Sequence, residues 1–157
     1  LAAIVKEEFT EAEALFGTST AGIAHAAITA EILGLPMGYV RGSAKDHGRQ
    51  NQVEGKLSKG DKVVVVEDLI STGGSVLDCV KVLQENGAEV LGIVSIFTYG
   101  MQKGKDRLAE AKVVNHSLCD LDALLPVAVE QGYIEKEEQE KLLRFRDNPS
   151  DESWREA

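Results

Sequence analysis

Short apolar runs alternate along the chain with longer stretches of helical periodicity. The clearest run is Val63 to Val66, and four consecutive β-branched residues are typical of a strand buried on both faces, as in a parallel sheet. Shorter runs predict strands at Ala14–Phe16, Met37–Val40 and Val90–Phe97, with a weaker strand at Lys112–Val114. Each run is short enough to be one strand of a compact domain.

Helical patterns lie between most of these runs. The clearest is Ala21–Leu33, which Gly34 and Pro36 close. Another follows Ser75, which we expect to cap it, and ends at Gly87. Further helices are predicted at residues 1–9, 121–130 and 136–146. The alternation indicates an α/β fold, a single domain over residues 1–157 with a mainly parallel sheet flanked by helices.

The chain begins at Leu1, without Met and already in a helical pattern, so we expect further N-terminal residues to precede it. Residues 41–62 break all periodicity. This stretch contains four glycines, six basic residues and only three acidic residues, although the whole chain has a formal net charge of −9. A long loop of this kind inside a compact domain is usually functional, so residues 41–60 are predicted to form a mobile lid.

The segment after the valine run carries the most specific chemistry. Two acids, Glu67 and Asp68, are followed by Leu69 and Ile70 and then by a hydroxyl- and glycine-rich turn over residues 71–75. Glycines and free N–H groups at a helix start favour phosphate. Carboxylates repel phosphate but accept hydrogen bonds from vicinal hydroxyls, so the segment predicts a ribose 5-phosphate site in which both acids face a solvated cleft.

A second turn with glycines and hydroxyl groups, residues 17–22, joins the first predicted strand to the next helix. Its glycine spacing is that of a nucleoside-triphosphate P-loop, but Ile23 and Ala24 stand where that motif needs Lys and Ser or Thr. A kinase or GTPase is therefore disfavoured. No Gly-x-Gly-x-x-Gly is present, which weakens the dinucleotide alternative. Two anion turns at one sheet edge suit a substrate with phosphate at one end and pyrophosphate at the other.

The overall negative charge limits the classes of partner that this chain is expected to bind. A pI near 4.8 argues against nucleic acid and against a membrane surface, because both require clustered Lys and Arg. No apolar stretch approaches the roughly 18 residues of a membrane span, and no signal peptide is recognisable, so a cytoplasmic protein is expected.

The segment over residues 63–75 resembles the phosphoribosyl-diphosphate (PRPP) motif of the type I phosphoribosyltransferases. Within that family, Arg41, Lys45, Asp46, His47 and Gly48 are similar to the Arg-x-x-x-Lys-Asp-His-Gly loop of the orotate phosphoribosyltransferases. The likeness runs from Gly17 to Arg146. It departs from the family at Gly42, where many members have Lys, and at Thr20-Ala21, where many have Lys.

The resemblance implies transfer of the 5-phosphoribosyl group from PRPP to orotate, which gives orotidine 5′-phosphate and pyrophosphate. The implied catalytic residues are Lys45, His47 and Asp68, and Ser71 is implied for orotate. The residues implied for PRPP are Thr18, Ser19, Thr20, Arg41, Lys45, His47, Glu67, Asp68, Leu69, Ile70, Ser71, Thr72, Gly73, Gly74 and Ser75.

The family also implies Mg²⁺, held mainly by pyrophosphate and water with no direct protein ligand, and a homodimer with shared active sites. Two alternatives remain open: a purine phosphoribosyltransferase and a non-catalytic PRPP-sensing regulator. A mere sensor would not need the Lys45-Asp46-His47 segment, and it would usually carry a nucleic-acid module.

Overall fold

The computed structural model describes residues 1–42 and 52–151. In that part of the chain six strands form one sheet in the order β3-β2-β1-β4-β5-β6. All neighbours are parallel except β2 and β3, which are antiparallel. The strands are β1 (Ala14–Thr18), β2 (Met37–Val40), β3 (Val53–Glu54), β4 (Lys62–Ile70), β5 (Glu89–Thr98) and β6 (Asn115–Asp120). The predicted α/β class is confirmed.

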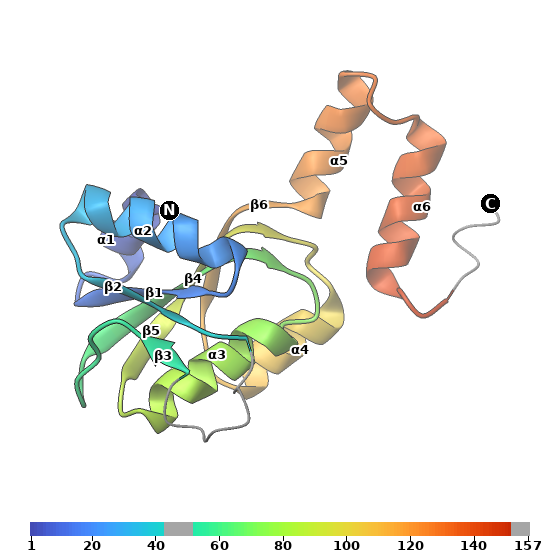
Figure 1. Ribbon diagram of the computed structural model, residues 1–157. Coiled ribbons are helices and arrows are strands. Elements are labelled where there is room, and N and C mark those ends of the chain that lie inside the picture. The colour runs from blue at the N-terminus through green and yellow to red at the C-terminus, as the bar shows by residue number, and fades with distance from the viewer. Residues whose placement is uncertain (43–51, 152–157) are drawn as a thin grey trace.

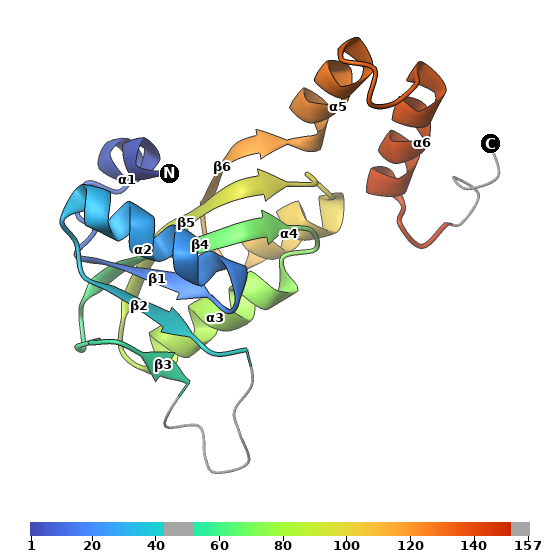
Figure 2. The same ribbon diagram turned by 45° about the horizontal axis from the view of Figure 1, so that its top comes forward.

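Helices cover both faces of this sheet (Figure 1). α1 (Ala2–Glu8) and α2 (Ala21–Leu33) lie on one face, and α3 (Gly74–Glu85) and α4 (Gln102–Glu110) on the other. α5 (Leu121–Glu130) and α6 (Lys136–Asp147) stand apart from the sheet beyond β6 (Figure 2). No helix within the described ranges is long and apolar enough to cross a bilayer.

The valine run of β4 explains the two-sided core. Val63 and Val65 pack in the cluster that contains residues of α3, whereas Val64 and Val66 pack in the cluster that contains residues of α1 and α2. All four side chains are fully buried. Alternate side chains of a strand point to opposite faces, so an uninterrupted apolar run is what a strand needs when helices cover both faces.

One predicted strand needs correction, and two elements were not predicted. The strand predicted at Lys112–Val114 is wrong: Lys112 has φ 55°, and the strand begins at Asn115. α4 was not predicted, because its sequence is mostly polar and contains Gly104. The two-residue β3 was also missed, since it lies in the polar stretch that broke the periodicity.

Candidate functional site

The acid pair lies inside β4, which continues through Glu67 and Asp68 to Ile70. Glu67 pairs in register with Ser95 of β5, and the strand ends with Ile70 beside Thr98. The backbone of both acids is therefore fixed by the sheet. Asp68 is half-buried, but Glu67 is only 6% exposed, so the expectation that both carboxylates face a solvated cleft is wrong for Glu67.

The buried Glu67 carboxyl is held by two donors. The Thr18 hydroxyl donates to Glu67 Oε1 at 2.6 Å, and the Asp68 N–H donates to the same oxygen at 2.9 Å. Burial, and after it the neighbouring Asp68 carboxyl, raise the pKa of Glu67 to about 7, although the hydrogen bonds from the Thr18 hydroxyl and the Asp68 N–H act in the opposite direction. Near neutral pH this carboxyl is thus poised between its acid and its anion.

The phosphate-type turn follows the end of β4. Ser71 and Thr72 are half-buried, and Gly73 adopts φ +74°, a conformation that glycine tolerates best. Gly73 precedes the first residue of α3, and its carbonyl accepts the Leu77 N–H at 3.1 Å. Ser75 lies inside the first turn of α3, so its predicted capping role is wrong. The helix start itself supplies the N–H groups that suit an anion.

The helix missed in the sequence braces this turn. Arg107 of α4 donates from Nη1 to the carbonyl oxygen of Thr72 at 3.1 Å. One turn earlier, a Cβ at Gly104 would lie 2.6 Å from the carbonyl oxygen of Ser71. α4 can therefore approach the turn closely only because residue 104 has no side chain. No motif signalled Arg107, because the helix that carries it has too few apolar residues to be recognised.

A cavity of about 340 Å³ unites the two predicted anion turns. The end of β1 contributes Thr18, the turn after it contributes Ser19, and the start of α3 contributes Gly74 and Ser75. Arg41 lines the same cavity from the end of β2 and pairs with Glu54 at 2.9 Å. The other lining residues are Val40, Gly42, Gln52, Asp78, Cys79 and Val82. Hydroxyl groups, helix-start amides and a guanidinium in one hollow can bind a phosphate or pyrophosphate.

The turn after β1 is tied to two neighbouring strands. Ser19 donates its hydroxyl to the Val40 carbonyl oxygen at 2.6 Å, at the point where β2 leads into Arg41. Thr18 makes the contact with Glu67 already described. The peptide bond between Ser19 and Thr20 is cis, and Thr20 precedes α2 as its N-terminal cap residue. Thr18 and Ser19 thus connect the acid pair with the beginning of the predicted lid.

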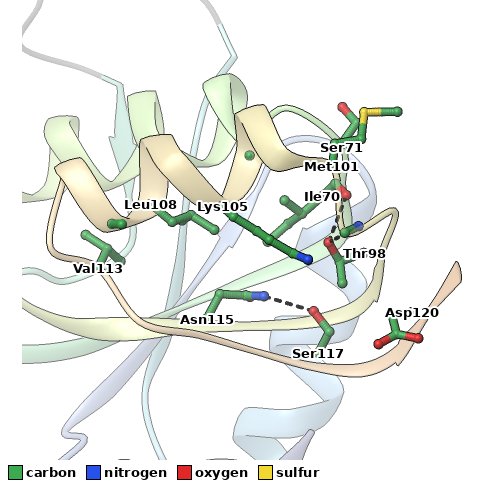
Figure 3. A pocket seen from close by; sticks show the side chains of 13 residues that line it. Ile70, Ser71, Thr98, Met101, Lys105, Leu108, Val113, Asn115, Ser117 and Asp120 are labelled. Atoms are coloured by element: carbon green, nitrogen blue, oxygen red, sulfur yellow. Dashed lines mark hydrogen bonds between the residues drawn. The ribbon is translucent and has the colours of Figure 1, made fainter. Parts of the chain in front are cut away.

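A second cavity, of about 470 Å³, adjoins the turn from the other side (Figure 3). It lies between α4 and the ends of β5 and β6, and the predicted site residues that line it are Ile70 and Ser71. Lys105 extends into it from α4, and Asn115 donates to the Ser117 hydroxyl at 2.9 Å on its floor. This hollow can hold a polar ring next to Ser71.

The structure does not bring every predicted residue to these cavities, because neither is lined by Thr20, Glu67, Asp68, Leu69, Thr72 or Gly73. Ile70 is 3% exposed and belongs mainly to the core, although it borders the second cavity. Leu69 is 42% exposed and lines neither cavity. Lys45 and His47, the two predicted catalytic residues of the lid, lie outside the described residues.

Protein side chains alone could hold a metal ion only where several His, Cys, Asp or Glu residues of the described ranges 1–42 and 52–151 lie together. No group of three or more His, Cys, Asp and Glu side chains there is placed to hold an ion. Mg²⁺ commonly binds proteins through one or two carboxylates together with substrate phosphates and water. An ion of this kind could reach the first cavity bound to substrate oxygens.

Comparisons with known proteins agree with this geometry. The sequence profile of the phosphoribosyl transferase domain family matches residues 1–123. The orotate phosphoribosyltransferase of Bacillus cytotoxicus is 56% identical over 151 residues, which are 96% of this chain and 72% of that protein. A Bacillus cereus orotate phosphoribosyltransferase is similar to the same extent.

Among solved structures, the orotate phosphoribosyltransferase of Aeropyrum pernix superposes with a TM-score of 0.70 at 32% identity, over 83% of this chain and 71% of that one. The chain therefore belongs to the phosphoribosyl transferase domain family and, within it, to the orotate phosphoribosyltransferases.

Proposed function

We propose that this protein transfers the 5-phosphoribosyl group from PRPP to orotate, giving orotidine 5′-phosphate and pyrophosphate for pyrimidine synthesis. The observation that carries the proposal is the first cavity, in which both anion turns meet and whose lining residue Thr18 donates a hydrogen bond to Glu67 of the acid pair. The 56% identity to orotate phosphoribosyltransferases supports the choice of orotate over a purine base.

The two ends of PRPP would occupy the two turns. The start of α3, with Ser71, Thr72, Gly73, Gly74 and Ser75, would hold the 5′-phosphate through backbone N–H groups and hydroxyls. The pyrophosphate would be received by the backbone of the turn over residues 18–20 and by the Arg41 side chain. Lys45 and His47 would close over it from the lid, and either could protonate the departing oxygen.

The acid pair would act on the sugar. Glu67 and Asp68 would accept hydrogen bonds from the ribose hydroxyls. Transfer through a cationic ribose places developing positive charge near them, and carboxylates positioned in advance lower the energy of that state without reorganising. Leu69 and Ile70 would contribute only backbone at this point, because one side chain is exposed and the other lies in the core.

Orotate would lie against Ser71, at the border between the two cavities. Magnesium, when bound, would neutralise part of the pyrophosphate charge. We also infer a homodimer with shared sites and a cytoplasmic location. An orotate phosphoribosyltransferase from Mycobacterium tuberculosis, 25% identical with a TM-score of 0.57 over 72% of this chain and 65% of that one, has been solved with PRPP, which supports PRPP as the donor in the family.

The deciding experiment incubates the protein with PRPP and Mg²⁺ and supplies orotate, uracil, adenine, guanine or hypoxanthine in separate reactions. Consumption of orotate with release of pyrophosphate is expected, and the other bases should remain. Consumption of a purine in place of orotate would favour the purine alternative, and PRPP binding without turnover of any base would favour a regulator.

A further inference from the structure

We propose that Thr18 is a positioning residue of the transfer reaction, whose buried hydroxyl holds the Glu67 carboxyl in place for the ribose hydroxyls. The inference rests on the proposed function and adds to it a residue that acts through another. Thr18 would therefore act on the ribose indirectly, by positioning Glu67, whereas the family resemblance implied that Thr18 contacts PRPP directly.

The contact between the two side chains is short and shielded. Thr18 is 4% exposed and Glu67 is 6% exposed, and their oxygens are 2.6 Å apart. A hydroxyl has a single proton to donate, and here it points to Glu67 Oε1, with the Val66 carbonyl as a weaker acceptor at 3.4 Å. That proton is therefore not free to bind pyrophosphate.

The backbone next to the Thr18–Glu67 contact leaves room for the Thr18 hydroxyl because residue 22 is glycine. A Cβ at Gly22 would lie 2.4 Å from Thr18 Oγ1 and 2.6 Å from the Val66 carbonyl oxygen. Any larger residue at position 22 would displace the hydroxyl. The first turn of α2 thus approaches β4 closely enough to enclose Thr18, so the short glycine-to-glycine spacing of this turn serves packing as well as any anion.

The charges around Glu67 explain why such a hydrogen bond matters. Asp68 is the acidic neighbour on β4, and Cys79 of α3 lies close enough for the Glu67 charge to raise its pKa further, above the rise that burial causes. On β1 the facing group is the Thr18 hydroxyl itself. Within the described residues no cation contributes to the Glu67 pKa, so hydrogen bonds favour the anion against burial and Asp68.

The inference is tested by comparing Thr18→Val, which keeps the shape but removes the hydroxyl, with Thr18→Ser, which keeps the hydroxyl. The carboxyl carbon of Glu67 is followed by NMR as a function of pH in protein labelled at glutamate Cδ, and Glu67→Gln identifies the resonance. In Thr18→Val the titration midpoint should rise by about one pH unit, the scale of one hydrogen bond to a carboxylate. Thr18→Ser should keep the parent's midpoint.

Ser19→Ala is the matched control for the titration, because it removes a hydroxyl from the same turn that bonds to Val40 and not to Glu67. Its Glu67 midpoint should equal that of the parent. In kinetics, Thr18→Val should lower kcat/KM for PRPP about tenfold at pH 7, and part of the loss should return at higher pH. Thr18→Ser should restore it.

The outcomes separate the two proposals. A parent protein that does not consume orotate overturns the proposed function. An active parent, with the same Glu67 midpoint and the same pH profile in Thr18→Val, overturns the role of Thr18 alone. A purely structural Thr18 would lower the melting temperature of Thr18→Val and leave both the midpoint and the pH profile in place, which also overturns the inference.

Discussion

Arg107 of α4 donates a hydrogen bond to the carbonyl oxygen of Thr72, at 3.1 Å. This contact joins a helix that the sequence pattern did not reveal to the turn that the pattern revealed best. A carbonyl held by a guanidinium keeps the neighbouring N–H groups aimed in one direction, which is what phosphate binding by a backbone requires. α4 is thus part of the site although it carries no recognisable motif.

Arg107→Ala should therefore weaken PRPP binding more than it weakens the fold. We expect the KM for PRPP to rise about tenfold, the scale of one charged hydrogen bond, with a melting temperature near that of the parent. Steady-state kinetics with varied PRPP measure this. Lys103→Ala, at an exposed position of the same helix, should change neither quantity, and an equal KM in Arg107→Ala would remove the bracing role.

Gly104→Ala should push α4 away from the turn. The added Cβ would lie 2.6 Å from the Ser71 carbonyl oxygen, which belongs to backbone and cannot swing aside. A cost of about 1 to 3 kcal/mol in the free energy of unfolding is expected from such overpacking. Urea denaturation of Gly104→Ala and of the parent measures it, and equal midpoints would mean that the turn yields without strain.

Replacing both acids should lower the activity strongly and spare the fold. The Glu67→Gln, Asp68→Asn double variant should lose activity by about tenfold or more, because amides accept the ribose hydroxyls more weakly and offset no positive charge. Orotate consumption at saturating PRPP measures the loss. Glu31→Gln, at an exposed position of α2, controls for the loss of a negative charge, and a double variant as active as the parent would remove the ribose assignment.

Glu67 alone should make stability depend on pH. Its pKa is about 7 in the folded protein and 4.5 ordinarily, so between these values the folded state binds a proton that the unfolded state has lost. The free energy of unfolding must then fall as pH rises from about 4.5 to 7. Relative to the parent, Glu67→Gln should gain on the order of 2 kcal/mol by pH 8 and nothing at pH 4.

Chemical denaturation of both proteins at several pH values checks this difference. The amide introduced by Glu67→Gln keeps an oxygen that can accept from Thr18 and from the Asp68 N–H, so lost hydrogen bonds should not mask the effect. A stability difference between the two proteins that stays constant from pH 4 to pH 8 would mean that Glu67 titrates near its ordinary value.

The shared active site is tested by complementation. Lys45→Ala and Asp68→Asn should each be inactive, because one lacks the lid cation and the other lacks an acid of the ribose site. If the lid of one subunit covers the partner's site, mixing the two should restore about a quarter of the parent's activity, since half of the dimers are mixed and each has one intact site of two. No recovery despite verified subunit exchange would place the lid over its own subunit.

The bounds of helices and strands were predicted best where a single local rule, such as a glycine at a helix end, determines them. The predicted bounds of α2 agree with the observed ones at both ends. Its C-terminal end was predictable because Gly34 adopts φ 67° and stops the helix. β4 was recognised from its valines, but its continuation through the acids to Ile70 depends on pairing with β5, which no local pattern records. The polar β6 was misplaced for the same reason: its pairing to β5 outweighs its weak strand propensity.

The site was predicted in its residue types but not in its geometry. The pattern placed an acid pair before a turn that leads into a helix, and in the structure β4 carries both acids and is followed by that turn and by α3. It could not show that Glu67 is buried, because burial depends on Thr18, which is distant in sequence and packed close by Gly22. Arg107 escaped notice because a lone cation on a polar helix has no pattern of its own.

The position of the acids inside β4 divides the site into two kinds of target for protein engineering. Glu67 and Asp68 lie in the part of β4 that pairs with β5, just beyond the last residue paired with β1, so a change there is constrained by that pairing. Residues 71–73 belong to no strand or helix. Redesign of phosphate or acceptor preference is therefore best directed at Ser71 and Thr72, whereas Gly73 and Gly104 of α4 must stay without side chains.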